Sequence, residues 1–203
     1  MEMQNPNILL ARWHDEFDIL NIVTIQNYND LIDTQDKDKI ADFFYHRMHS
    51  RYIKPFQYDN ETFKKNYKNG FSIMASCCLL IEAVQSFKNG WETSDKKSEK
   101  AFKEFLQSEK NFKDFNKKEK DFYKNIRCGI LHQGETTGGW KISRIGDYLF
   151  EDTSLTINSV RFLRELEFSL QQYTENLKTE KWDSDIWDNF RIKMRKVISN
   201  CES

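Results

Sequence analysis

Apolar residues recur every three or four positions along most of this chain, a spacing that places them on one face of an α-helix. The most apolar stretch, 70–87, is hydrophobic on nearly every side and therefore predicts a helix buried at the centre of the fold. One-sided patterns, several with a polar N-cap residue ahead of them and a Pro or Gly after them, predict further helices over 37–53, 98–109, 116–132, 158–177 and 183–197. The pattern as a whole predicts an all-α bundle.

Two stretches depart from this helical spacing. The apolar residues before position 33, among them Phe17, Ile22 and Val23, fit a helix or a strand, and we predict a helix there. After Gly138 and Gly139, apolar and polar residues alternate, which predicts a short β-hairpin near residues 140–157. A hairpin of that size cannot form the body of a fold. We therefore expect a single, mainly all-α domain over 1–203, with an N-terminal extension (1–36), the inserted hairpin and a C-terminal helix (183–203).

Composition supports a folded domain and limits its partners. A chain of 203 residues is long enough to bury roughly 70% of its unfolded surface, and 16 Phe, 8 Tyr and 5 Trp supply the apolar bodies for a core. Lys and Arg number 31 against 32 Asp and Glu, so the whole molecule has no electrostatic preference for nucleic acid or an anionic membrane. Any nucleic-acid site must therefore be a local patch.

The sequence also predicts a location. No stretch approaches the roughly 20 apolar residues of a membrane span, and residues 1–10 lack the basic and apolar regions of a signal peptide. The four cysteines show no disulfide-framework spacing, and two of them lie in the apolar run 70–87. We therefore expect a cytoplasmic protein in a reducing compartment, without a membrane partner.

Arg127 and His132 are the strongest candidates for chemistry, because they lie close together at the end of a predicted helix. Arg presents a permanently charged fork to phosphate oxygens, and His exchanges a proton near neutral pH. Five residues advance a straight α-helix by about 140° past a full turn, so the two side chains would not share a face. Fraying at Gly134, or a second copy in a symmetric dimer, could bring them together. The alternative is that Arg127 pairs with a carboxylate and His132 interacts with the negative helix end.

Glu82 is the one acidic residue in the apolar run 70–87. A buried carboxylate without a partner is costly. We expect it to pair with Arg127, which would orient the guanidinium. In the alternative, Glu82 lies at an exposed edge of its helix.

Other candidates are weaker. Arg47 and Arg51, one helical turn apart, and Lys124 could contact RNA phosphates, although an ordinary solvated helix face explains the pair Arg47 and Arg51 as well. His46 and His49 could both touch a metal ion, but the spacing offers no third ligand. The missing third ligand predicts that no metal is bound. The sequence also has no phosphate-binding loop, serine-hydrolase elbow or dinucleotide fingerprint, and we expect no cofactor.

The segment 121–132, DFYKNIRCGILH, ends an amphipathic helix and resembles the motif of HEPN domains (higher eukaryotes and prokaryotes nucleotide-binding). In that family an Arg and a His separated by four to six residues form a metal-independent endoribonuclease site across a dimer. The resemblance implies that Arg127 stabilises the phosphorane, that His132 is the general acid or base, and that Cys128 stands at the family's polar position. The loop 133–140 would be a flexible flank of the site.

The same resemblance implies RNA as the substrate, a homodimer, a role in phage defence or as a toxin, and an antitoxin or other regulatory partner. Some members of the family have no nuclease activity. The alternative function is therefore a non-catalytic helical module that binds RNA or another protein.

Overall fold

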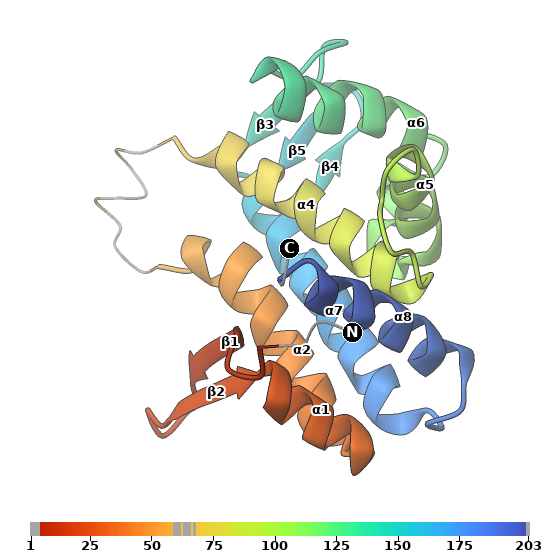
Figure 1. Ribbon diagram of the computed structural model, residues 1–203. Helices are drawn as coiled ribbons and strands as arrows, with labels where there is room; N and C mark the ends of the chain where they lie inside the picture. The colour runs from red at the N-terminus through yellow and green to blue at the C-terminus, as the bar shows by residue number, and fades with distance from the viewer. Residues whose placement is uncertain (1–4, 59–61, 63–65, 67, 202–203) are drawn as a thin grey trace. The chain divides into compact units, whose positions relative to one another are not determined.

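The computed structural model describes residues 5–58, 62, 66 and 68–201. Within them the protein is mainly helical with two small sheets of two and three strands, which confirms the expected mainly-α character (Figure 1). The chain divides into two compact units of discontinuous segments: Met1–Arg51, Ser86–Thr93 and Leu170–Ser203 form the first, and Tyr52–Gln85 and Ser94–Ser169 form the second. We describe each unit separately, and the expectation of one domain stays a prediction.

The first unit begins with an antiparallel pair of strands, β1 (Leu9–His14) and β2 (Leu20–Thr24). The predicted helix is therefore wrong for residues 9–24, because apolar residues so close together fit both periods and the strand pairing decides between them. The helix α1 (Ile25–Asp33) follows directly, and Thr24 caps it in a capping box with Asn27.

The helices α2 (Lys37–Tyr52) and α8 (Asp185–Ser199) complete this unit with the second half of α7 (Ser159–Thr179). Aromatic side chains form its core around Phe44, whose ring meets those of Phe87, Tyr173 and Phe190 edge to face at centroid distances of 4.7–5.5 Å. The predicted helix boundaries in this unit agree with the structure within a few residues.

The second unit contains most of α4 (Gly70–Lys88), followed by α5 (Ser98–Ser108), the short helices η2 (Lys110–Phe115) and α6 (Glu119–Phe122), and the π-helix η3 (Tyr123–Gln133). It also holds the 3₁₀ turn η1 (Lys54–Phe56) and the first half of α7. Its core is again aromatic, with the ring of Phe122 in contact with those of Phe102, Phe115, Trp140 and Phe162.

The helix α4 (yellow in Figure 1) is the predicted apolar helix. By length and composition alone it could cross a membrane, but 67% of its most apolar window is buried in the structure. This share of burial is typical of a core helix.

The predicted β-hairpin is present in β4 and β5, but the structure adds a third, parallel strand that was not predicted. The strands β3 (Lys141–Ser143), β4 (Phe150–Glu151) and β5 (Thr156–Asn158) form one sheet in the order β3–β5–β4, with β3 parallel to β5 and β4 antiparallel to it. The apolar alternation marks the strands, but it does not say that the last one lies between the other two, where Ile157 is fully buried.

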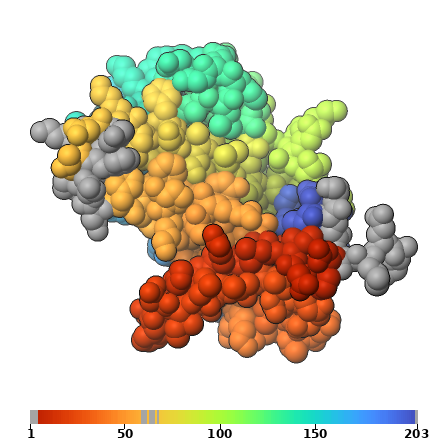
Figure 2. All heavy atoms as spheres, turned by 60° about the vertical axis from the view of Figure 1, so that its left-hand side comes forward, coloured from red at the N-terminus to blue at the C-terminus, as the bar shows by residue number. Residues whose placement is uncertain are grey.

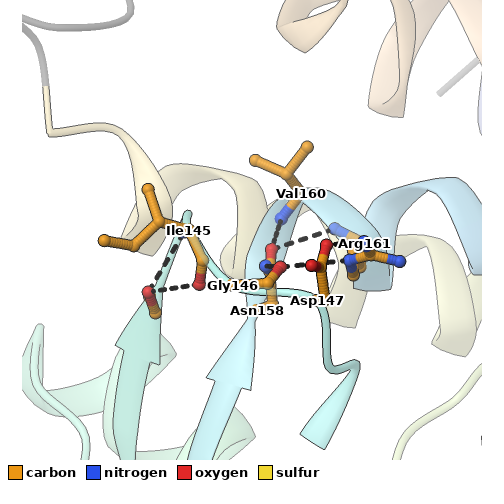
Figure 3. Close-up of polar contacts among 7 residues, drawn as sticks. Ile145, Gly146, Asp147, Asn158, Val160 and Arg161 are labelled. Carbon is orange, nitrogen blue, oxygen red and sulfur yellow. Dashed lines mark hydrogen bonds and ion pairs between the residues drawn. The ribbon is translucent and has the colours of Figure 1, made fainter.

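The sheet leads into α7 through a set of hydrogen bonds shown in Figure 3. Asn158 Oδ1 accepts from the backbone N–H of Val160 and Arg161, so this residue caps α7 as expected. Its amide also donates to the carbonyl of Gly146, and Arg161 forms an ion pair with Asp147 at 2.6 Å. The cap thus joins the loop 144–149 to the start of the helix.

Candidate functional site

The candidate site lies on η3, which has the i→i+5 hydrogen bonding of a π-helix instead of the predicted α-helix. In this winding, residues five apart are about one turn apart. Arg127 and His132 therefore lie on the same face, with Arg127 Nη1 at 2.9 Å from His132 Nε2. The expectation that they point to different faces is wrong, and the contact forms within one chain, without fraying of the helix or a second copy.

The helix also begins later than predicted. Asn116 follows η2, Lys118 is the N-cap residue of α6, and the π-helix starts at Tyr123. Its end is as predicted, because Gly134 has the left-handed φ of +73° and its N–H bonds back to the carbonyls of Gly129 and Ile130.

The loop after His132 is tied to η3 and is not the free flank that was expected. Thr137 makes two hydrogen bonds to Asn125, one from its backbone N–H and one from its hydroxyl. The backbone N–H of Glu135 donates to the backbone carbonyl of Gly129. The hydroxyl of Thr136 donates to the backbone carbonyl of Trp140 at 2.6 Å. These bonds hold the loop on the helix that carries the candidate residues.

Glu82, on α4, holds the other side of the guanidinium. Arg127 Nε donates to Glu82 Oε1 at 2.7 Å, and the two side chains are only 16% and 12% exposed, which confirms the expected pairing. Burial by itself lowers the pKa of Arg127, but the hydrogen bond and charge of Glu82 outweigh it, so the pKa is raised. The guanidinium is therefore a permanently charged group held in one orientation.

The imidazole of His132 contacts the guanidinium through Nε2. Because a guanidinium nitrogen can only donate, Nε2 is the acceptor in this contact. His132 is exposed, and Figure 2 shows the end of η3 and the following loop (green to teal) at the surface. The imidazole thus lies beside a fixed cation where a ligand has access.

Two residues that the sequence analysis did not select complete this network. The hydroxyl of Ser98, on α5, donates to Glu82 Oε1 at 2.8 Å. Tyr123 lies half-buried one helical turn before Arg127, with the guanidinium carbon 5.8 Å from its ring centre. Burial and the neighbouring Cys128 raise the pKa of Tyr123, against the opposite effect of Ser98. The position of Tyr123 four residues before Arg127 was a usable signal, whereas nothing distinguishes Ser98 in the sequence.

The remaining candidates have different surroundings. Cys128 is half-buried and interacts with Tyr123, and Lys124 is exposed on η3. Arg47 is only 6% exposed and donates from Nη1 to the carbonyl of Leu10, so it joins α2 to β1. The expectation that Arg47 contacts RNA is therefore wrong. Arg51 also points a nitrogen at that carbonyl, at 3.5 Å. Both arginines belong to the first unit, whereas the Arg127 site belongs to the second.

The two neighbouring histidines of α2 have aromatic contacts. The ring of His46 stacks on Trp13 at 4.6 Å, and that of His49 stacks on Tyr45 at 5.3 Å. Among the residues that the structure describes, no group of three or more His, Cys, Asp or Glu side chains lies close enough to hold a metal ion.

The site combines the charged guanidinium of Arg127 and the imidazole of His132, both on η3, with the carboxylate of Glu82 on α4, which holds the guanidinium. Such a set can bind a phosphodiester and move a proton on it. Comparison of the chain with protein-family models, curated proteins and solved structures gives no significant match.

Proposed function

We propose that this protein is a metal-independent endoribonuclease of the HEPN type that acts as a homodimer on RNA. The observation that carries the proposal is the 2.9 Å contact between Arg127 and His132, made in a single chain by the π-helix. This contact supports the proposal because it puts the Arg and His of the HEPN-like segment 121–132 close enough for both side chains to reach one phosphodiester.

The chemistry follows from the two side chains. The ribose 2′-hydroxyl replaces Arg127 Nη1 as the hydrogen-bond partner of His132 Nε2. Nε2 then takes the hydroxyl proton, and the 2′-oxygen attacks the adjacent phosphorus. The bond from phosphorus to the 5′-oxygen breaks, that oxygen receives a proton from a protonated imidazole, and a 2′,3′-cyclic phosphate remains. Arg127 stabilises the additional negative charge of the phosphorane, since Nε stays bound to Glu82 and the Nη1 released by His132 joins the other N–H donors of the guanidinium.

Glu82 and Ser98 act on this reaction through Arg127. Glu82 holds the guanidinium through Nε, and Ser98 holds the same carboxylate oxygen. Such preorganisation matters because a group that must be reoriented in the transition state stabilises it less.

A dimer would place two copies of this pair in one cleft, so that one imidazole acts as base and the other as acid. The exposed end of η3 is the part of each chain that we assign to that interface. A role in defence or as a toxin, and a partner that restrains the activity, belong to the same proposal.

The test is cleavage of varied RNAs in EDTA by purified wild type, Arg127→Ala and His132→Ala. We expect both variants to lose about 100-fold or more of the rate and wild type to leave 2′,3′-cyclic phosphate ends, read by mass spectrometry. His14→Ala and Arg195→Ala, which change exposed residues of the first unit, are the matched controls. Circular dichroism and sedimentation check the fold and oligomeric state of each variant.

Two results would contradict the nuclease. One is cleavage that survives in folded His132→Ala at the wild-type rate, which points to a contaminant. The other is RNA binding without any cleavage by wild type, which favours the non-catalytic binding module.

A further inference from the structure

A hollow of ≈ 360 Å³ opens beside Arg127, on the side of the guanidinium that Glu82 holds. It is formed within the second unit by α4, the segment before α5, the first turn of α5 and η3. Its lining residues are Glu82, Ser94, Asp95, Lys96, Ser98, Glu99, Tyr123 and Arg127.

The hollow is rich in hydrogen-bond acceptors. The charge of Arg127 is matched by Glu82, and the rest of the wall carries the carboxylates of Asp95 and Glu99 against the one cation of Lys96. A second phosphate is therefore disfavoured there, because its charge would face an excess of carboxylate. A neutral group that offers N–H donors is the better match.

Tyr123 gives the hollow an aromatic wall. Its ring contacts that of Phe102, at 5.8 Å between ring centres, and it lies next to Arg127. Unpaired RNA bases are bound by aromatic side chains and by hydrogen bonds to their Watson–Crick edges. A hollow lined by both an aromatic ring and hydrogen-bond acceptors therefore fits a nucleobase.

The carboxylate of Glu99 decides between the bases. It is exposed, it lines the hollow, and it makes no hydrogen bond or ion pair with the residues that the structure describes, so its two oxygens are available to a ligand. Guanine presents N1–H and the N2 amino group side by side, which suits a bidentate carboxylate. Adenine and cytosine present one donor next to an acceptor, and uracil presents one donor between two carbonyls.

We propose that this hollow binds a guanine base of the RNA, with Glu99 accepting from N1–H and the N2 amino group and Tyr123 as the aromatic wall. The phosphodiester next to that guanine would then lie at Arg127 and His132. The inference rests on the proposed nuclease for its biological meaning, but the binding site itself can be tested without cleavage.

The first experiment measures the affinity of the full-length protein for GMP, AMP, CMP, UMP and IMP by calorimetry. IMP lacks the N2 amino group, so it loses one hydrogen bond to a charged acceptor, and we expect it to bind about tenfold more weakly than GMP. Glu99→Gln should remove the preference for GMP over AMP. Glu104→Gln, which lies on the same helix but outside the hollow, should keep it.

Equal affinity for all five nucleotides, no binding of any of them, or a preference that survives in Glu99→Gln would overturn the inference. The second experiment compares cleavage of oligonucleotides that contain a single guanosine, or inosine in its place. Guanine-selective binding without cleavage would leave the hollow assigned and remove the nuclease, whereas cleavage without any base preference would leave the nuclease and remove the guanine site.

Discussion

At the scale of single residues, the charge of Arg127 is the feature on which the site depends. Its guanidinium lies between a carboxylate and an imidazole, with one nitrogen bound to each. A half-buried cation with an oriented partner keeps its charge and its direction when a ligand arrives. The network thus positions the guanidinium as well as supplying reactive groups. Its members are Tyr123, Ser98, Glu82, Arg127 and His132.

Removal of the carboxylate should cost stability as well as activity. We expect Glu82→Ala to lower the free energy of unfolding by about 3 kcal/mol, because Arg127 is then left half-buried without its partner. Urea unfolding measures the difference. Glu104→Ala, whose ion pair with Lys100 is more exposed, should cost less than about 1 kcal/mol. Equal losses in the two variants would mean that the buried pair has no special weight.

A second residue-scale prediction concerns Tyr173, whose hydroxyl is buried and has no hydrogen-bond partner among the described residues. Burial raises the pKa of Tyr173 above its usual 10.0. Above about pH 10 the unfolded chain releases this proton while the folded chain retains it, so the stability falls as the pH rises.

Tyr173→Phe should therefore raise the free energy of unfolding by about 1 kcal/mol at neutral pH, since no hydrogen bond is lost. It should also make the alkaline decline shallower. Denaturant titrations at pH 7 and pH 10.5 compare it with Tyr148→Phe, a change at a partly exposed position. A destabilised Tyr173→Phe would show that the hydroxyl has a partner in solution.

At the scale of elements, the π-helix η3 and the loop 134–140 act together. A Cβ on Gly129 would clash with the backbone carbonyl oxygen of Glu135 in the loop. A Cβ on Gly138 would likewise clash with the side-chain Oδ1 of Asn125 on η3. Glycine at position 129 therefore permits the loop to lie directly on the helix. His132 is at the last turn of η3, so the position of the imidazole depends on this contact.

Gly129→Ala tests that dependence. The added methyl would overlap with the backbone of Glu135, and the loop must move away. We expect a loss of about 2 kcal/mol in the free energy of unfolding and faster amide exchange over 134–140, measured by hydrogen–deuterium exchange. Lys124→Ala, at an exposed position of the same helix, should leave both unchanged. Unaltered exchange in Gly129→Ala would show that the loop is not held by η3.

At the scale of the whole molecule, α4 and α7 each contribute residues to both compact units. The thiols of Cys77 and Cys78 report on the part of α4 that belongs to the second unit, because they are fully buried and burial raises the pKa of both. Cys201, by contrast, is exposed.

Alkylation with iodoacetamide at pH 7.5 should therefore modify Cys201 within the first minutes and leave Cys77 and Cys78 intact until the protein unfolds. Peptide mass spectrometry across a urea series measures the order. Modification of Cys77 or Cys78 well below the unfolding midpoint would mean that α4 opens by itself in the native state.

The sequence by itself determined the elements whose signals are local. Helical spacing predicted α2, α4, α5, α7 and α8 nearly to the residue, Gly134 predicted the end of η3, and the position of Glu82 among apolar residues predicted its pairing with Arg127. These features depend on periodicity, on backbone freedom and on the cost of a buried charge, which are all readable along the chain.

Only the tertiary structure decided the rest. Strand pairing made residues 9–24 a hairpin, and the return of the chain placed β5 between β3 and β4. The loop packs directly on Gly129 of the π-helix. The π winding brings Arg127 into contact with His132, whereas α-helical spacing predicted that the two side chains point to different faces. Each of these outcomes is set by which distant segments share a surface, and spacing along the chain carries no information about that.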